Sequence, residues 1–204
     1  MSQRMSRRMS LAVSQGVAIL VAILLTSPFA HALPCSGTWD PPGPSVGSVF
    51  PDELKLTDQT GKPQYAGALM GRDGLAVFFV RSADWCPFCK HQLVDVNLRL
   101  ADFRERGLNV VSVSMDSVDK IAAFHEAQHI GYTMLSDADG RIVEKLGIRD
   151  PQYSDGSRAY GVARPMIFIL DPKLRITHKY AEESFRNRPD LTCVLADLSK
   201  KPKS

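Results

Sequence analysis

The sequence predicts an α/β fold, and its hydrophobic pattern carries that prediction. Three short runs are almost entirely apolar, as expected of strands that are covered on both faces: 75–80, 108–115 and 166–170. A long amphipathic segment lies between the first two runs and ends at Gly107. A buried strand, a helix and a second buried strand in this order predict a crossover unit with two parallel strands.

The residues before the first buried run predict an extended lead-in. The segment 33–49 carries prolines and glycines around Trp39 (LPCSGTWDPPGPSVGSV), a composition that sustains neither a helix nor a central strand. Residues 53–57 alternate in polarity like a short edge strand, and 58–61 (DQTG) predict a turn. The folded domain is therefore expected to span residues 50–204.

The elements after this turn follow from periodicity and from helix start and stop signals. Apolar side chains at Leu93, Val96, Leu100 and Phe103 predict one helix of about five turns over 86–106. Ser117 is expected to cap the next helix. The remaining predicted elements are that helix to about residue 129, a strand at 132–135, a helix at 141–146, a strand at 175–179 and a last helix at 191–199.

The amino terminus has the layout of an export signal. Basic residues, an apolar run, a helix breaker and a small-residue cleavage site follow one another: Arg4, Arg7 and Arg8, then 16–25, Pro28 and Ala30-His31-Ala32. We expect residues 1–32 to be a signal peptide and the protein to be periplasmic or secreted. The paired arginines leave the export route open. An uncleaved signal would instead anchor the protein to the membrane.

The charge balance excludes nucleic acid as a partner. The chain of 204 residues has 25 basic and 22 acidic residues, with 44% hydrophobic and 23% charged residues, which is typical of a globular protein. Removal of residues 1–32 takes away three arginines and no acid, which leaves 22 basic residues against 22 acidic ones. Such a chain lacks the basic excess that binding to a polyanion requires.

The chemistry of the sequence is centred on two cysteines at the start of the predicted long helix, Cys86 and Cys89. Backbone N–H groups and the helix dipole converge on Cys86 and favour its thiolate, so it should lose its proton below the value of about 8.5 of a free cysteine. Pro87 suits the first helical position. We expect Cys86 to be the nucleophile and Cys89 to close an intramolecular disulfide.

A metal site is the alternative for a pair of cysteines at this spacing. Cys35 and Cys193 each lack a partner three residues away, so no second half of a zinc site is visible. Whether these two cysteines are bridged stays open, because sequence does not give their separation. The sequence thus predicts no metal and no cofactor, and a metal carrier that uses Cys86, Cys89 and a histidine is the third functional alternative.

Two segments resemble the thioredoxin superfamily, and within it the AhpC/TSA redoxin branch: 78–90 (FFVRSADWCPFCK) and 164–171 (RPMIFILD). The resemblance covers residues 46–199. It implies a thioredoxin-like three-layer fold, with a central mixed sheet flanked by helices. It also implies that Pro165 is a cis-proline whose backbone orients the substrate, and that Trp85 shields the two sulfurs.

The resemblance leaves two activities in competition. Family peroxidases carry a hydroxyl three residues before the reactive cysteine, where this chain has Ala83, and an arginine at the strand start, where Pro165 stands with Arg164 beside it. Thioredoxins carry a buried acid where this chain has Val80, so the proton of Cys89 would pass to Asp84, Lys90 or water. We therefore expect, first, a thiol–disulfide oxidoreductase.

This oxidoreductase would act on a protein or small-molecule disulfide and would be recycled by a thiol reductant or oxidant that the sequence does not identify. The alternative is a thiol-dependent peroxidase that uses Cys86 and Arg164. Both activities rest on the same nucleophile.

Overall fold

The computed structural model describes Cys35, residues 39–50 and residues 55–199. The predicted signal peptide, 1–32, lies outside the described residues. Within the described ranges, every helix is too short or too polar to cross a membrane.

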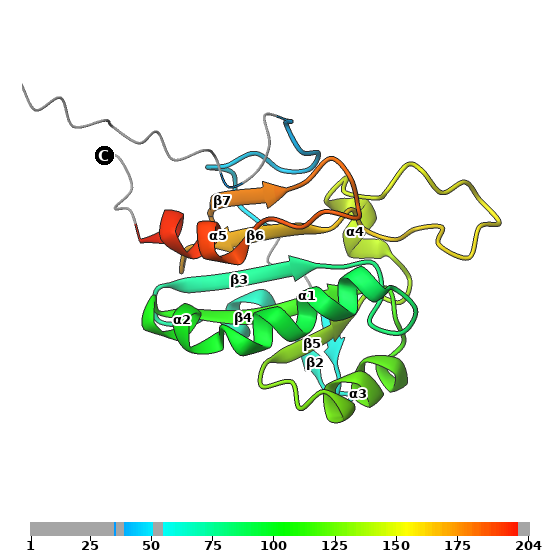
Figure 1. Cartoon of the computed structure of the whole chain (residues 1–204), viewed down its shortest axis with the longest axis horizontal. Coiled ribbons are helices and arrows are strands. Elements are labelled where there is room, and N and C mark those ends of the chain that lie inside the picture. The colour runs from blue at the N-terminus through cyan, green and yellow to red at the C-terminus, as the bar shows by residue number, and fades with distance from the viewer. Residues whose placement is uncertain (1–34, 36–38, 51–54, 200–204) are drawn as a thin grey trace, which may run out of the picture. The chain divides into compact units, whose positions relative to one another are not determined.

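A seven-stranded mixed sheet forms the centre of the domain (Figure 1). Its strands run in the order β2-β1-β5-β4-β3-β6-β7. The bounds are β1 (Leu56–Asp58), β2 (Pro63–Gln64), β3 (Gly74–Phe79), β4 (Leu108–Ser114), β5 (Thr133–Ser136), β6 (Met166–Leu170) and β7 (Ile176–Ala181). β4 pairs in parallel with β3 and β5, whereas β6 pairs antiparallel with β3 and β7. The predicted mixed sheet and parallel crossover are confirmed.

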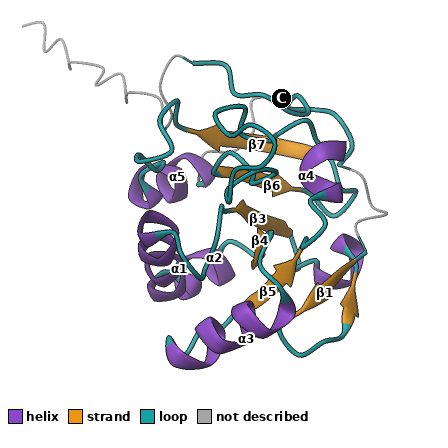
Figure 2. Cartoon of the chain, turned by 90° about the vertical axis from the view of Figure 1, so that its right-hand side faces the viewer, coloured by secondary structure: helices purple, strands orange, loops and turns teal. Residues whose placement is uncertain are grey.

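Helices cover both faces of the sheet and give three layers (Figure 2). The helices are η1 (Ala66–Leu69), α1 (Pro87–Leu98), α2 (Leu100–Glu105), α3 (Val118–Ala127), α4 (Arg141–Lys145) and α5 (Leu191–Leu198). One hydrophobic cluster joins the sheet to α1, α2, α3 and α5, and a second joins its other face to α4 and Phe50. Because every residue of β3 and β6 is buried, these strands read as unbroken apolar runs in the sequence.

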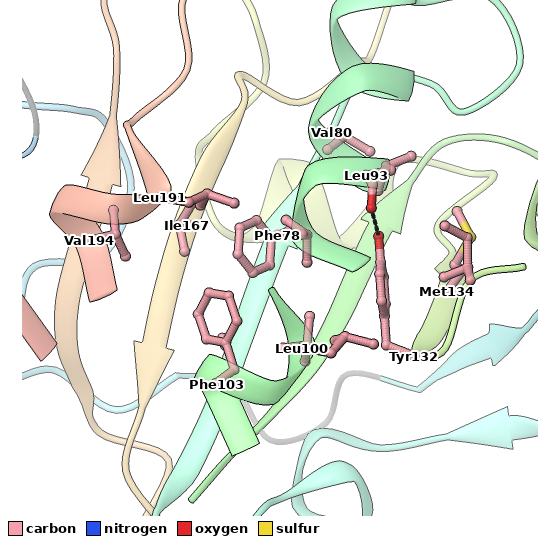
Figure 3. Close-up of a cluster of buried hydrophobic side chains, with 14 of the residues drawn as sticks. Phe78, Val80, Leu93, Leu100, Phe103, Tyr132, Met134, Ile167, Leu191 and Val194 are labelled. Carbon is pink, nitrogen blue, oxygen red and sulfur yellow. Dashed lines mark hydrogen bonds between the residues drawn. The ribbon is translucent and has the colours of Figure 1, made fainter. Parts of the chain in front are cut away.

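The first cluster fixes α1 against the sheet (Figure 3). The rings of Phe78 in β3 and Phe103 in α2 meet edge to face, with centroids 5.8 Å apart. The hydroxyl of Tyr132 donates to the backbone carbonyl of Leu93 over 3.1 Å (Figure 3). The helix that begins at the two cysteines is therefore held by the core at its middle.

The predicted helix over 86–106 is wrong in one respect, because it breaks at Arg99. This residue has φ −106° and ψ 13°, and it ends α1 and begins α2. The side chain of Asn97 accepts a hydrogen bond from Gly131 N–H at 2.7 Å and donates to the His129 carbonyl at 3.2 Å. The break lies where this loop packs on the helix, and such a tertiary contact leaves no trace in the periodicity.

Smaller differences concern segments with weak sequence signals. β2 and η1 are too short to show a period, and they were not predicted. Ser117 precedes α3 as expected, but its side chain makes no capping hydrogen bond. The described part of the lead-in has no helix, and its backbone joins the sheet region through a bridge between Val49 and Arg175.

Candidate active site

The two cysteines lie at the amino terminus of α1, as the sequence predicted. Cys86 is the N-cap residue, and Pro87 occupies the first helical position. The Cys86 sulfur accepts a hydrogen bond from the backbone N–H of Cys89, with N and Sγ 3.3 Å apart. The two residues form a disulfide, and their side chains are 1% and 0% exposed. The turn thus supplies Cys86 with an N–H donor that favours a negative charge on its sulfur.

A buried carboxylate holds the loop that leads into this turn. Asp116 accepts hydrogen bonds from the Ser82 hydroxyl at 2.7 Å and from the Ala83 N–H at 2.6 Å. The Ser114 hydroxyl also donates to Asp116, at 2.8 Å, which ties the loop to the end of β4. The Ser82 hydroxyl in turn accepts from the Trp85 N–H at 3.1 Å. This network fixes the residues directly before Cys86.

Arg81 is a buried cation beside the site that the sequence analysis missed. Its side chain is surrounded by aromatic faces, and its guanidinium lies 4.2 Å from the ring centre of Phe185, 4.9 Å from that of Tyr153 and 5.1 Å from that of Trp85. One nitrogen donates to the Tyr153 hydroxyl. Its Nε is buried and has no hydrogen-bond acceptor among the described residues. Arg81 has no carboxylate partner there either, so its charge is uncompensated.

Arg188 is a second missed cation, and it contacts a sulfur directly. Its Nη2 lies 3.4 Å from the Sγ of Cys89. Its other acceptors are neutral: the Gln92 side-chain oxygen at 2.6 Å and the carbonyls of Phe185 and Asn187. Burial, together with the charge of Arg81, lowers the pKa of Arg188 to about 10, which still leaves it charged at neutral pH.

The sequence holds a signal for one of these arginines. Arg81 follows the fully buried strand β3 by two residues and precedes Cys86 by five, a place where a charged side chain is unusual. Arg188 lies 99 residues after Cys89, in an irregular segment without a motif. Only the packing of α5 and its leading loop against α1 brings it to the sulfur.

Trp85 lies at the start of the reactive turn, and its shielding of the two sulfurs stays a prediction. It is half-buried and packs against the hydrophobic cluster that contains Cys86 and Cys89. Arg164 lies elsewhere: its guanidinium is 5.0 Å from the ring centre of Trp39 and donates to the Glu183 carbonyl at 3.3 Å. The structure therefore packs Trp85 against the cluster that contains the two cysteines, and it places Arg164 beside the lead-in and the end of β7.

Pro165 is buried directly before β6, but its expected cis peptide bond is wrong. The described residues contain no cis peptide bond. Trans is the lower-energy form of a peptide bond before proline. The preceding residue, Arg164, donates a backbone hydrogen bond to the Ile148 carbonyl at 2.8 Å. The pairing of Phe79 with Met166 still places Pro165 at the sheet end where β3 leads to Cys86.

The groups expected to take the proton of Cys89 are poorly suited to that role. Asp84 forms an ion pair with Lys120 at 2.7 Å, and the hydrogen bond from Lys120 lowers the pKa of Asp84. Lys90 is exposed, whereas Cys89 is fully buried. The position of the missing acid is filled by buried Val80. The contact from Arg188 to Cys89 is the feature that acts on this sulfur.

The other two cysteines are bridged, which answers the question that the sequence left open. Cys35 and Cys193 form a disulfide, with Cα atoms 5.4 Å apart and a sequence separation of 158 residues. Among the described residues, no group of three or more potential metal ligands lies together. The bridge ties the lead-in to α5 and leaves Cys86 and Cys89 as a separate pair.

Comparison with known families decides the relationship. The model of the AhpC/TSA family matches residues 46–179. The chain belongs to the AhpC/TSA family. It is an oxidoreductase of thioredoxin-like fold, as the resemblance implied.

Relatives within this family are peroxiredoxins. Peroxiredoxin Bcp of Escherichia coli is 24% identical over 146 residues, which cover 72% of this chain and 91% of that protein. A putative peroxiredoxin of Mycobacterium tuberculosis is 31% identical over 116 residues, which cover 57% of this chain and 72% of that protein. These names favour the peroxidase alternative over the disulfide exchange that the sequence analysis placed first.

Solved structures share the fold. Peroxidoxin BcpB of Mycobacterium tuberculosis superposes with a TM-score of 0.63 at 22% identity, over 79% of this chain and all of that chain. Peroxiredoxin 6 of Arenicola marina gives a TM-score of 0.67 at 19% identity, over 76% of this chain and 72% of that one. At these identities the likeness concerns the fold.

Proposed function

We propose that the protein is a thiol-dependent peroxidase in which Cys86 is oxidised by peroxide and Cys89 resolves the product. The observation that carries the proposal is the Cys86 sulfur at the N-cap of α1, with an N–H donor and a second sulfur in bonding reach. Peroxiredoxins among its relatives support the choice of peroxide as the oxidant.

The reaction has three steps whose atoms and electrons balance. The Cys86 thiolate attacks one peroxide oxygen, the O–O bond breaks, and a sulfenic acid forms while the other oxygen leaves as an alcohol or water after protonation. The Cys89 thiolate then attacks the Cys86 sulfur and releases hydroxide, which becomes water. An external dithiol finally reduces the disulfide by two electrons and is itself oxidised to a disulfide.

Arg188 stabilises the Cys89 thiolate that attacks Cys86 in the second step. A cation 3.4 Å from the Cys89 sulfur, bonded otherwise to neutral acceptors, favours the thiolate over the thiol. Charge stabilisation of this kind replaces the buried acid that thioredoxins use to accept the proton. Cys89 would then enter the resolving step already ionised, with no need for Asp84 or Lys90.

Thiol–disulfide exchange is the second candidate, and a specific observation favours it. Ala83 is 1% exposed and supplies no hydroxyl beside the sulfur, and Arg164 is bound to Glu183 and stacked on Trp39. The peroxide oxygens would therefore lack both donors that the family resemblance implied. Disulfide exchange needs the same Cys86 thiolate without these donors.

We also propose that the enzyme works in the periplasm or outside the cell. The predicted signal peptide motivates this location, and the disulfide between Cys35 and Cys193 supports it, because structural disulfides persist in oxidising compartments. A cysteine introduced within residues 1–32 tests whether this predicted signal peptide is removed during export. Its alkylation is measured with and without permeabilisation of the outer membrane, and a removed segment leaves no such cysteine on the exported protein.

Stopped-flow consumption of hydrogen peroxide tests the peroxidase proposal. The reduced Cys89→Ser variant should consume one equivalent of peroxide rapidly and stop at the sulfenic acid, which a dimedone probe would label at Cys86. Cys86→Ser should consume peroxide no faster than free cysteine does. If Cys89→Ser reacts as slowly as free cysteine but traps disulfide partners covalently, peroxidase activity is rejected in favour of disulfide exchange.

A further inference from the structure

A cavity beside the site has no part in the proposed reaction. Its volume is about 310 Å³, and it is bordered by Trp85, the start of α3 and the loop between α4 and β6. Trp85, which directly precedes Cys86, forms part of its wall. A molecule in this cavity would therefore lie next to the residue that directly precedes Cys86.

The charged walls of the cavity are mainly basic. Arg81, Lys120 and Arg158 line it from three separate segments of the chain. Two carboxylates offset part of this charge: Asp84 pairs with Lys120 at 2.7 Å, and Asp116 lies in the wall. One positive charge remains in excess among these residues.

The two carboxylates do not satisfy Arg81. Asp116 is occupied by the Ser82 hydroxyl, the Ala83 N–H and the Ser114 hydroxyl, and Asp84 bonds to Lys120. The Arg81 side chain is 5% exposed, and its Nε has no acceptor among the described residues. A buried charged donor without an acceptor is costly, so an incoming anion would be bound there with little competition.

We propose that this cavity binds the carboxylate of a small co-substrate whose reactive end reaches Cys86 past Trp85. The inference rests on the proposed function. A single excess charge suits a singly charged ligand better than a phosphate dianion, and the guanidinium fork of Arg81 and the charge of Arg158 suit two oxygens of one carboxylate. The guanidinium of Arg81, which would bind the carboxylate, lies 5.1 Å from the ring centre of Trp85. Trp85 directly precedes the reactive Cys86, so the bound carboxylate and the reacting sulfur would be separated by this one residue.

The carboxylate has two possible carriers in the proposed cycle, and both reactions balance. An organic hydroperoxide would take two electrons from Cys86 and leave as an alcohol. A dithiol would give two electrons to the Cys86–Cys89 disulfide and leave as a cyclic disulfide. The same cavity would serve either molecule, because the recognised group is the same.

Matched substrate pairs test the site and identify the carrier. Linoleic acid hydroperoxide is compared with its methyl ester, and dihydrolipoate with dihydrolipoamide, so that each pair differs by one carboxylate charge. We expect kcat/KM to favour the carboxylate member of one pair by about tenfold at low ionic strength, with the preference shrinking as salt is added. Equal kcat/KM values within both pairs would overturn the proposal.

Charge variants show where the preference arises. Arg158→Gln and Lys120→Gln should each reduce the preference to about threefold or less and leave the single-turnover reaction of the reduced enzyme with hydrogen peroxide unchanged. Arg149→Gln is the matched control, because Arg149 is not among the residues that line the cavity: it pairs with Glu144 and reaches the wall only through its stacking on the ring of Tyr160. A preference that survives both cavity variants would overturn the assignment to this cavity.

The two proposals fail separately. An enzyme that consumes hydrogen peroxide but treats both members of each pair alike retains the proposed function and loses this site. An enzyme that consumes no peroxide loses the proposed function, and the dithiol pair still tests the site, because reduction of the Cys86–Cys89 disulfide needs no peroxide.

Discussion

At the scale of single residues, two guanidinium groups set the charge around the sulfur pair. Arg188 contacts the Cys89 sulfur, and Arg81 lies on the aromatic rings beside Trp85. Among the described residues, the hydrogen-bond acceptors of both guanidinium groups are neutral, so neither arginine is paired directly with a carboxylate. This environment favours thiolates and anionic substrates, and it suits both proposed reactions of Cys86.

The role of Arg188 can be measured on Cys89 alone. In a Cys86→Ser background, Arg188→Gln should reduce the thiolate absorbance of Cys89 at neutral pH, because the stabilising cation is gone. With both cysteines present, closure of the disulfide after peroxide treatment should slow by about tenfold, since a free-cysteine-like thiol is only a few per cent ionised at pH 7. Absorbance at 240 nm and stopped-flow fluorescence record the two effects.

Two further variants separate charge from packing at this position. Arg188→Lys keeps the charge and should retain most of the thiolate signal. Arg186→Gln removes an exposed cation that lies 4.8 Å from the ring centre of Phe185, and it should change neither readout. An Arg188→Gln protein with an unchanged Cys89 absorbance would leave Arg188 with a packing role only.

At the scale of elements, two buried carboxylates, those of Asp116 and Asp58, hold the loops that connect strands and helices. Asp116 joins the end of β4 to the loop before α1. Asp58 does the same between β1 and β2, where it accepts hydrogen bonds from the Thr60 N–H and hydroxyl, the Lys62 N–H and the Gln64 side chain. Each carboxylate adds side-chain hydrogen bonds where two segments of the backbone meet outside the strands.

Asp58 predicts an acid-sensitive contribution to stability. Burial alone raises its pKa, but the hydrogen bonds from Thr60, Gln64 and Lys62 outweigh burial and lower the pKa to about 2. The ionised form therefore stabilises the fold above the unfolded pKa of about 4, and this contribution is lost as the pH falls towards 2. Asp58→Asn should lower the free energy of unfolding at pH 7 by about 1–2 kcal/mol.

Urea unfolding at several pH values checks this prediction. The difference between wild type and Asp58→Asn should be constant from pH 5 to 7 and should shrink below about pH 4, because the wild-type carboxylate becomes protonated. Asp171→Asn is the control variant, because Asp171 also accepts backbone hydrogen bonds in a turn, the exposed one between β6 and β7. Its free energy of unfolding is measured over the same pH range. A difference that does not change with pH would show that Asp58 acts through its shape and not through its charge.

At the scale of the whole molecule, one covalent bond joins the two ends of the described chain. The disulfide between Cys35 and Cys193 encloses nearly the entire domain, whereas the one between Cys86 and Cys89 spans a single helical turn. A long enclosed loop restricts the unfolded chain far more than a short one. The first disulfide is therefore suited to stability and the second to reaction.

Removal of each disulfide should separate these two roles. Replacement of Cys35 and Cys193 together by Ser should lower the free energy of unfolding by about 3–5 kcal/mol and leave the reaction of Cys86 with peroxide unchanged. The matched double replacement of Cys86 and Cys89 by Ser should cost less stability and abolish the reaction. Urea titrations under oxidising conditions measure both. Equal losses of stability would contradict this division.

The sequence by itself determined the order of the layers and the place of the reactive pair. Unbroken apolar runs define buried strands, and a cysteine pair that opens an amphipathic helix places the nucleophile at the helix terminus, because both signals are local. The same local signals could not show the break at Arg99, which depends on a loop some thirty residues away.

Only the tertiary structure decided the electrostatics around the sulfurs and the pairing of Cys35 with Cys193. Arg188 reaches Cys89 from 99 residues away, and the guanidinium of Arg81 packs against aromatic rings and has no carboxylate partner among the described residues. Local patterns record what a residue prefers next to its neighbours in the chain. The charge that a sulfur experiences depends on what the folded chain places beside it, and this packing is not encoded in any short segment.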